Sequence, residues 1–325
     1  MLSVEGLHTS YVTRDGTVRA IQDASFFVHA GEILGIVGES GSGKTTAGLA
    51  TMGLVPYPGR VTGGRIRFHG HDLNELDEDE RRLLRGEAMA MIFQDPQAAL
   101  NPLMTIGAQM AEIFNTHGQI VHSQVREQTE DALASLGLPD PGRILQSYPW
   151  QLSSGMCQRV MIAMMLVLEP ELLIADEPTS AQDVTLQAEI LERILGLAKD
   201  HGMGVILITH DMGVMARAAD RVMVMYAGRI VESADTVSLF RNPQHPYTWA
   251  LLQSMPRLDS DRRALRNVPG APPDLLDPPD ECPFLARCHK ATVSCRTMPM
   301  PPLRTIGAGH MLACYNPMTA AQSAG

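Results

Sequence analysis

The hydrophobic positions of the chain fall into short continuous runs separated by segments with helical spacing. Three runs, at residues 33–37, 171–175 and 204–209, are apolar at nearly every position, which is typical of strands buried on both faces. Between the second and third runs, residues 185–200 place apolar side chains three and four positions apart, which predicts a helix with one buried face. Buried strands joined by helices indicate a parallel sheet that helices cover on both sides.

Two further segments have different patterns. Residues 60–72 alternate around glycines, as an antiparallel hairpin at the edge of a sheet does. Residues 95–165 have mainly helical spacing, with a break where proline and glycine cluster at residues 138–142. We therefore predict an α/β protein with a parallel sheet, an antiparallel β subdomain and a helical subdomain at about residues 95–165.

The composition changes after residue 235. Thirteen of the 22 prolines lie beyond this point, and six of them fall within residues 269–283. Proline lacks an amide donor, so such a density opposes regular structure. We predict one domain over residues 1–235 and an irregular C-terminal extension over residues 236–325, whose order depends on docking or on a staple.

Composition and charge exclude several classes of protein. With 45% hydrophobic and 19% charged residues, the chain has the composition of a packed protein and not of a disordered one. The formal charge of -10 is a poor match for a nonspecific nucleic-acid binder, which needs a basic surface. The longest apolar run, residues 160–168, is too short to span a membrane, and the N-terminus has no secretory signal pattern. We expect a cytoplasmic protein that can reach a membrane through partners.

The strongest chemical signal follows the run at residues 33–37. The next residues read GESGSGKTT, which matches the pattern G-x-x-x-x-G-K-[ST] at the point where a strand leads into a helix. Glycines let the backbone N–H groups turn toward a phosphate, and the start of the helix adds its positive end. Lys44 can reach the β- and γ-phosphates, and Thr45 offers a hydroxyl to Mg²⁺. The predicted nucleotide-binding residues are Gly38, Ser40, Gly41, Ser42, Gly43, Lys44, Thr45 and Thr46.

A second signal ends the run at residues 171–175. Asp176 and Glu177 follow this strand, at the sheet edge where ligands bind in open α/β folds. An acidic pair alone could equally cap a helix. Together with the phosphate loop, the pair predicts that Asp176 holds Mg²⁺ through water and that Glu177 orients or deprotonates the attacking water.

Further motifs follow in a fixed order along residues 1–235. Gln94 lies in MIFQDP, residues 152–156 read LSSGM, residues 180–183 read SAQD, and His210 follows the run at residues 204–209. Gln94, residues 180–183 and His210 match the Q-loop, the D-loop and the switch histidine, and residues 152–156 resemble the LSGGQ signature. The chain thus resembles the nucleotide-binding subunit of an ABC transporter, with a P-loop NTPase (RecA-like) core.

The resemblance implies roles for individual residues. ATP is the nucleotide, Tyr11 lies under its adenine, and two subunits face each other head to tail with each ATP between them. The signature, where a helix is expected to begin near Ser153, serves the ATP of the opposite subunit. Ser154 stands where glycine is usual, so we expect the site completed by this signature to be slower. The implied catalytic residues are Glu177, His210 and Gln94; the Mg²⁺ ligands are Thr45, Gln94 and Asp176; the signature residues are Ser153, Ser154, Gly155 and Met156.

The C-terminal extension resembles one branch of these ATPases. Residues 242–255 read NPQHPYTWALLQSM, similar to the HPYT-x-ALL segment of the oligopeptide/dipeptide/nickel branch. The four cysteines after it resemble the pattern that binds a [4Fe–4S] cluster in that branch, which would staple the proline-rich tail. Zinc and free thiols are the alternatives. The predicted cluster ligands are Cys282, Cys288, Cys295 and Cys314.

The function that the resemblance implies is ATP hydrolysis that powers the import of oligopeptides or dipeptides. The implied partners are a second and non-identical ABC ATPase, two transmembrane permease subunits and an extracytoplasmic substrate-binding protein, on the cytoplasmic face of the membrane and without nucleic acid. A nickel or other small-solute importer of the same branch is the alternative. Two further alternatives are a soluble ABC ATPase that acts on nucleic acid or the ribosome, and a subunit that binds ATP without hydrolysing it.

Overall fold

The computed structural model describes residues 1–117, 122–178, 184–255, 268–276, 278 and 280–319. The chain forms two compact units. The first contains residues 1–28, 33–74 and 207–325, and the second contains residues 29–32 and 75–206.

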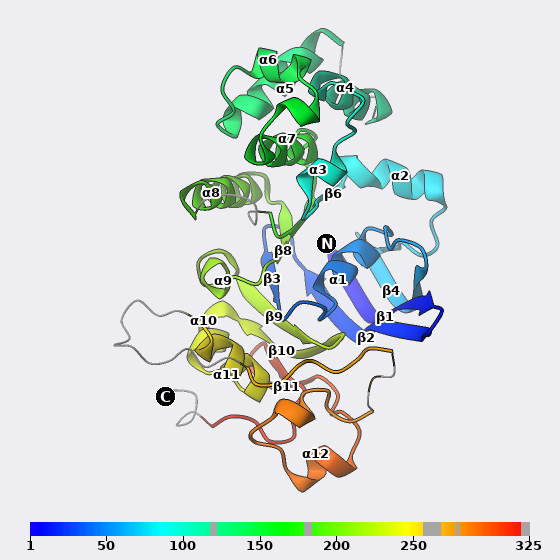
Figure 1. Ribbon diagram of the computed structural model, residues 1–325, viewed down its shortest axis with the longest axis vertical. Coiled ribbons are helices and arrows are strands. Elements are labelled where there is room, and N and C mark those ends of the chain that lie inside the picture. The colour runs from blue at the N-terminus through cyan, green and yellow to red at the C-terminus, as the bar shows by residue number, and fades with distance from the viewer. Residues whose placement is uncertain (118–121, 179–183, 256–267, 277, 279, 320–325) are drawn as a thin grey trace. The chain divides into compact units, whose positions relative to one another are not determined.

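The first unit contains a four-stranded antiparallel sheet. Its order is β2 (Gly16–Val28), β1 (Leu2–Thr13), β4 (Gly59–Phe68) and β5 (His71–Asp72), which are drawn in blue and cyan in Figure 1. The helix α1 (Lys44–Thr51) packs against β1 and β2. The antiparallel pairing of β4 with β5 confirms the hairpin predicted at residues 60–72.

A second set of strands in this unit carries the phosphate loop. Strand β3 (Ile33–Val37) is buried along its whole length and pairs in parallel with β9 (Arg221–Tyr226). Beyond β9 lie β10 (Arg229–Asp235), β12 (His310–Leu312) and β11 (Arg304–Gly307), all antiparallel to their neighbours. The helices α9 (Met212–Ala218) and α10 (Thr236–Arg241) pack on β3 and β10 respectively.

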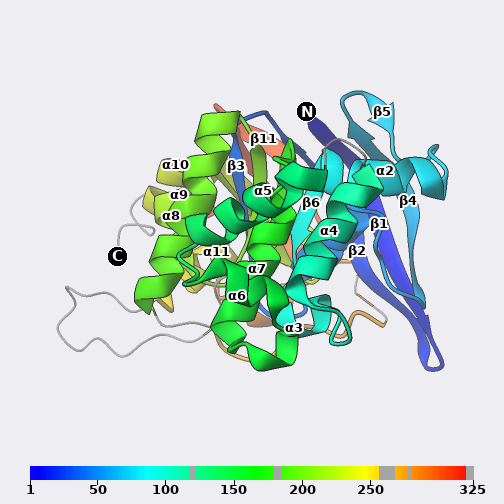
Figure 2. The same ribbon diagram turned by 90° about the horizontal axis from the view of Figure 1, so that it is seen from above.

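The second unit is mainly helical. Its strands β6 (Met89–Ile92) and β7 (Leu172–Asp176) are fully buried and parallel, and β8 (Gly204–Ile208) begins in this unit. Figure 2 shows α4 to α7 gathered together, which confirms the helices predicted over residues 95–165. The helix predicted at residues 185–200 is α8. The helices of the unit are α2 (Glu78–Glu87), α3 (Pro96–Ala99), α4 (Ile106–His117), α5 (His122–Ser135), α6 (Pro141–Gln146), the 3-10 turn η1 (Pro149–Gln151), α7 (Ser154–Leu166) and α8 (Val184–His201).

The C-terminal extension is more regular than its proline content predicts. It contains α10, α11 (Pro246–Gln253), the 3-10 turn η2 (Leu285–Arg287), α12 (Val293–Thr297) and the hairpin β11–β12. The described residues of 269–283, where the prolines are dense, form no helix or strand. The hairpin lies after this segment, and its strand β12 pairs with β10. The division of the chain at residue 235 stays a prediction. None of the helices in the described ranges has the length and hydrophobicity needed to cross a bilayer.

A buried carboxylate and a buried histidine organise the start of α11. Glu232 on β10 is completely buried, and its carboxylate accepts hydrogen bonds from the backbone N–H groups of Gln244 (2.6 Å) and His245 (2.9 Å) and contacts His310 Nε2 at 2.8 Å. His245 caps α11, because its Nδ1 accepts the N–H of Tyr247 at 3.1 Å. Burial lowers the pKa of His245 to about 4, which the negative charge of Glu232 only partly opposes. The histidine is therefore neutral in the folded protein near pH 7.

This histidine should make the fold sensitive to acid. The pKa of this histidine is 6.5 in the unfolded chain and about 4 in the folded chain. As the pH falls from 6.5 to 4, the unfolded chain therefore takes up a proton that the folded chain does not, and unfolding becomes more favourable. We expect the term to reduce the free energy of unfolding by about 3 kcal/mol at pH 4 relative to neutral pH. His245→Asn keeps an acceptor at the helix cap and removes the titration, so its denaturant midpoint should fall less between pH 7 and pH 4. The exposed His71→Asn is the control, and equal pH profiles for wild type and His245→Asn would contradict the prediction.

Candidate functional site

The loop after β3 needs glycine at two positions where other residues would collide. A Cβ on Gly38 would overlap the carbonyl oxygen of Met225, because β9 lies directly against the loop. Gly43 has a φ of 100°, and a Cβ there would lie 2.7 Å from the carbonyl oxygen of Ala20. Both glycines therefore let the backbone of the loop pack between β2 and β9 and enter α1.

Lys44 begins α1 and folds back over the loop. Its side chain is only 8% exposed, and its Nζ donates to the carbonyl oxygens of Gly38 (2.8 Å) and Glu39 (2.9 Å). The N–H of Ser42 donates to the same carbonyl of Glu39 at 3.2 Å. The ammonium group is thus positioned by backbone atoms of the loop that it closes, while Thr45 is exposed at the first turn of the helix.

The acidic pair predicted after the strand lies in the second unit together with the predicted glutamine. Asp176 is the last residue of β7 and is 2% exposed, and Glu177 follows with a φ of 47°, a left-handed conformation that is uncommon outside glycine. The amide Nε2 of Gln94 donates to Oε2 of Glu177 at 2.9 Å. The structure therefore brings Gln94 and Glu177 together, with a backbone strain of the kind that concentrates at functional sites.

His210 and Tyr11 lie in the first unit. His210 is exposed at the end of β8, immediately before Asp211, whose carboxylate caps α9 by accepting from the N–H groups of Gly213 (2.7 Å) and Val214 (3.2 Å). Tyr11 is half-buried on β1, and its ring lies against Gly59, where a Cβ would meet it. The roles of Tyr11 under adenine and of His210 in catalysis stay predictions.

The signature segment starts a helix, as its sequence predicts. Ser153 is the N-cap of α7, and its Oγ accepts the N–H of Met156 at 3.3 Å. Ser154 is the first helical residue, is exposed, and is not among the described non-glycine residues with positive φ. Ser154 therefore has backbone torsions that an L-residue adopts without strain, as is usual in the first turn of a helix. The D-loop residues 180–183 lie outside the described residues.

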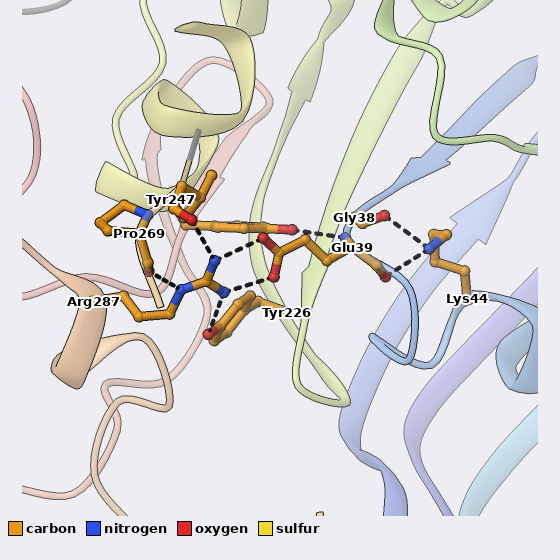
Figure 3. A network of polar contacts seen from close by, with 8 residues as sticks. Gly38, Glu39, Lys44, Tyr226, Tyr247, Pro269 and Arg287 are labelled. Atoms are coloured by element: carbon orange, nitrogen blue, oxygen red, sulfur yellow. Dashed lines mark hydrogen bonds and ion pairs between the residues drawn. The ribbon is translucent and has the colours of Figure 1, made fainter. Parts of the chain in front are cut away.

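Sequence reasoning missed one set of contacts to the phosphate loop. Glu39, a variable position of the motif, forms an ion pair with Arg287 of the C-terminal extension (Figure 3). Its backbone N–H donates to the hydroxyl of Tyr247 at 2.8 Å. Residues so distant in the chain have no local pattern that could have predicted the pairing.

A buried strand that leads into a glycine-rich loop, a lysine and a helix, with a second buried strand that ends in two carboxylates, defines a P-loop nucleoside triphosphatase. The model of the ABC transporter family matches residues 21–180, and the model of the oligopeptide/dipeptide transporter C-terminal region matches residues 231–295. The chain belongs to the ABC transporter family and is one of its ATPases.

Relatives extend the similarity over nearly the whole chain. The dipeptide transport ATP-binding protein DppD of Bacillus subtilis is 47% identical, over 97% of this chain and 94% of its own length. The oligopeptide transport ATP-binding protein OppD of Salmonella typhimurium is 43% identical, over 98% of this chain and 94% of its own length. A solved dimeric ATP-binding cassette in a post-hydrolysis state with ADP and Pi matches with a TM-score of 0.67 and 26% identity, over 73% of this chain and 99% of that chain.

The predicted iron–sulfur cluster is wrong. Within the described part of the chain, no group of three or more His, Cys, Asp or Glu side chains could hold a metal ion, so the structure supports neither the cluster nor the zinc alternative. Burial raises the pKa of Cys282 to about 11 and that of Cys314 to about 12, and it also raises the pKa of Cys288. In the metal-free chain these thiols are therefore neutral near pH 7. The four cysteines, Cys282, Cys288, Cys295 and Cys314, are free.

Proposed function

We propose that this chain is the ATP-binding and hydrolysing subunit of an importer that takes up dipeptides or oligopeptides. The observation that carries the proposal is the likeness to dipeptide and oligopeptide transport ATP-binding proteins at 42–47% identity, which includes the C-terminal extension. The names of these relatives favour peptides over nickel as the cargo. Retention of Glu177 and His210 favours hydrolysis over simple nucleotide binding.

The side chains of the first unit bind the nucleotide in this proposal. Two carbonyl oxygens of the loop orient Lys44, and we infer that its ammonium group binds the β- and γ-phosphates of ATP. Backbone N–H groups at the start of α1 bind the phosphates in this proposal. Tyr11 stacks under adenine, a contact worth roughly 1–3 kcal/mol for a base on an aromatic ring.

Glu177 and Gln94 of the second unit and His210 of the first carry the chemistry of hydrolysis in this proposal. Glu177 accepts a proton from the attacking water as a general base, and Gln94 holds the carboxylate in place through the 2.9 Å hydrogen bond. His210 contacts the γ-phosphate and stabilises its charge. Removal of that phosphate separates the two ATPase subunits, because the signature of each one binds the γ-phosphate on the other.

Three side chains of the predicted site suit magnesium. Thr45, Gln94 and Asp176 offer a hydroxyl, an amide oxygen and a carboxylate, and Mg²⁺ prefers such oxygen ligands and retains several waters. When bound, the ion neutralises charge on the β- and γ-phosphates.

The partners follow from the same likeness. We propose a second, non-identical ABC ATPase, two transmembrane permease subunits and an extracytoplasmic substrate-binding protein, with this chain on the cytoplasmic face of the membrane. Ser153, Ser154, Gly155 and Met156 act on the ATP of the second ATPase. Ser154 adds a side chain where glycine is usual, so that site is expected to be slower.

Purification of the assembly from membranes tests the proposal. A tagged full-length chain should carry with it a permease pair and a second ATPase. After reconstitution with the binding protein, di- and oligopeptides should stimulate ATP hydrolysis and accumulate in the vesicles. Association without transport of peptides, or stimulation by nickel alone, would contradict the peptide assignment, and recovery of the tagged chain with ribosomes or nucleic acid would contradict transport.

A further inference from the structure

Arg287 reaches from the C-terminal extension to the phosphate loop with both arms of its guanidinium group. Its Nη1 lies 2.6 Å from Oε2 of Glu39, and its Nη2 lies 2.9 Å from Oε1. The Arg287 side chain is 5% exposed and that of Glu39 is 25% exposed. Paired contacts in a shielded setting make this one of the stronger kinds of ion pair, unlike the exposed pairs elsewhere on the surface.

The remaining donors of Arg287 are satisfied by the extension and by β9. Nε donates to the carbonyl oxygen of Pro269 at 2.7 Å, Nη2 donates to that of Val268 at 3.2 Å, and Nη1 donates to the hydroxyl of Tyr226 at 3.1 Å. The guanidinium carbon also lies 5.7 Å from the ring centre of Tyr226. The arginine is therefore fixed in one orientation before it meets Glu39.

Glu39 transmits this fixation to Lys44. Its carboxylate is bound by Arg287, its N–H donates to Tyr247, and its carbonyl oxygen accepts from Lys44 (Figure 3). Tyr247 belongs to the HPYT segment and is itself fully buried. Every polar group of Glu39 thus has a partner. Two of these partners, Tyr247 and Arg287, follow β10 in the chain.

We propose that Arg287 and Tyr247 are positioning residues for ATP binding: they fix Glu39, so that the phosphate loop and Lys44 are ordered before ATP arrives. Ordering one backbone residue costs about 1–2 kcal/mol, and a loop that is already ordered avoids this cost when the ligand binds. Neither residue touches the reacting atoms in this scheme. Their loss should weaken the affinity for ATP and leave the rate at saturating ATP nearly unchanged. The inference rests on the proposed ATP-binding role of Lys44.

Arg287→Met in the full chain tests the inference, since it keeps most of the side-chain stem and removes the charged fork. We expect the Kd for a fluorescent ATP analogue with Mg²⁺, and the KM for ATP in the assembled transporter, to rise about tenfold, with kcat within about twofold of wild type. The double variant Glu39→Gln/Arg287→Met should be no weaker than the single one, because both changes break the same contact. Arg296→Met, an exposed arginine of the same extension, is the matched control and should bind as wild type does.

A purely structural role for Arg287 predicts a different result. The variant would then unfold at a lower temperature without nucleotide and still bind ATP with the affinity of wild type, which would overturn the inference. If Arg287→Met does not fold, Tyr247→Phe removes only one hydroxyl, and we expect it to raise the Kd about threefold. An unchanged Kd in Tyr247→Phe would equally overturn the inference. Failure of the wild-type chain to bind Mg-ATP would instead refute the proposed function.

Discussion

Replacing Glu177 by glutamine should leave ATP binding intact and slow ATP hydrolysis by roughly 10²–10⁴-fold, the range attributed to a general base. Glutamine has the same shape as glutamate, and its amide oxygen can still accept the hydrogen bond that Gln94 donates at 2.9 Å. What is lost is the group that takes the proton of the attacking water. The two measurements are turnover in the reconstituted transporter, which should fall, and the Kd for Mg-ATP, which should stay at the value of wild type.

The control for this substitution is Glu192→Gln, which makes the same chemical change at an exposed position of α8. It should hydrolyse ATP at the rate of wild type. Undiminished hydrolysis by Glu177→Gln would place the base elsewhere in the chain. A parallel loss of ATP affinity would show that Glu177 has a structural role in the loop after β7, where its left-handed conformation could make the backbone sensitive to substitution.

The features that the sequence predicts well depend on contacts between near neighbours. The loop at residues 38–46 can be recognised from a short sequence pattern, because its glycines, lysine and threonine are close together in the chain. The start of α7 at Ser153 follows from a hydroxyl that reaches only three residues ahead. Continuous apolar runs identify β3 and β7, because a strand covered on both faces has no polar positions.

The features that the sequence does not predict depend on residues that are far apart. Glu39 and Arg287 are separated by 248 positions, and either one alone resembles an ordinary surface charge. The hairpin β11–β12 joins β10 across a stretch dominated by prolines, so composition alone favoured irregular structure. Tertiary pairing decides both cases, and a local pattern contains no information about the partner.

The cysteines show how spacing can mislead. Spacing records the order of thiols along the chain but not how the folded chain places them, and the described residues contain no group of three or more such side chains that could hold a metal ion. The extension gains its order from packing instead. Phe284 is 1% exposed, and its ring centre lies 5.3 Å from those of both Tyr226 and Tyr247. This aromatic cluster lies next to the Arg287–Glu39 ion pair and packs the segment against β9 and α11.

Lys44 is the second side chain whose loss should have a large effect, and the effect should fall on ATP binding as well as on turnover. Its ammonium group is held close to the loop by the carbonyl oxygens of Gly38 and Glu39 at 2.8 and 2.9 Å. It is 8% exposed, so its charge is partly shielded from water and interacts strongly with an anion placed nearby. Hydrogen bonds that involve charged groups contribute roughly 1.5–3 kcal/mol each.

Lys44→Ala should therefore raise the Kd for Mg-ATP about a hundredfold, which corresponds to a loss of about 3 kcal/mol. ATP hydrolysis in the assembled transporter should fall with it and should recover only in part at high ATP concentration, since the same charge also stabilises the γ-phosphate as it leaves. Lys199→Ala, an exposed lysine near the end of α8, is the matched control and should bind ATP normally. Circular dichroism and the unfolding temperature without nucleotide would show whether Lys44→Ala is folded. A folded Lys44→Ala protein with the ATP affinity of wild type would remove the phosphate loop from the proposed site, because no other side chain of the loop carries a positive charge.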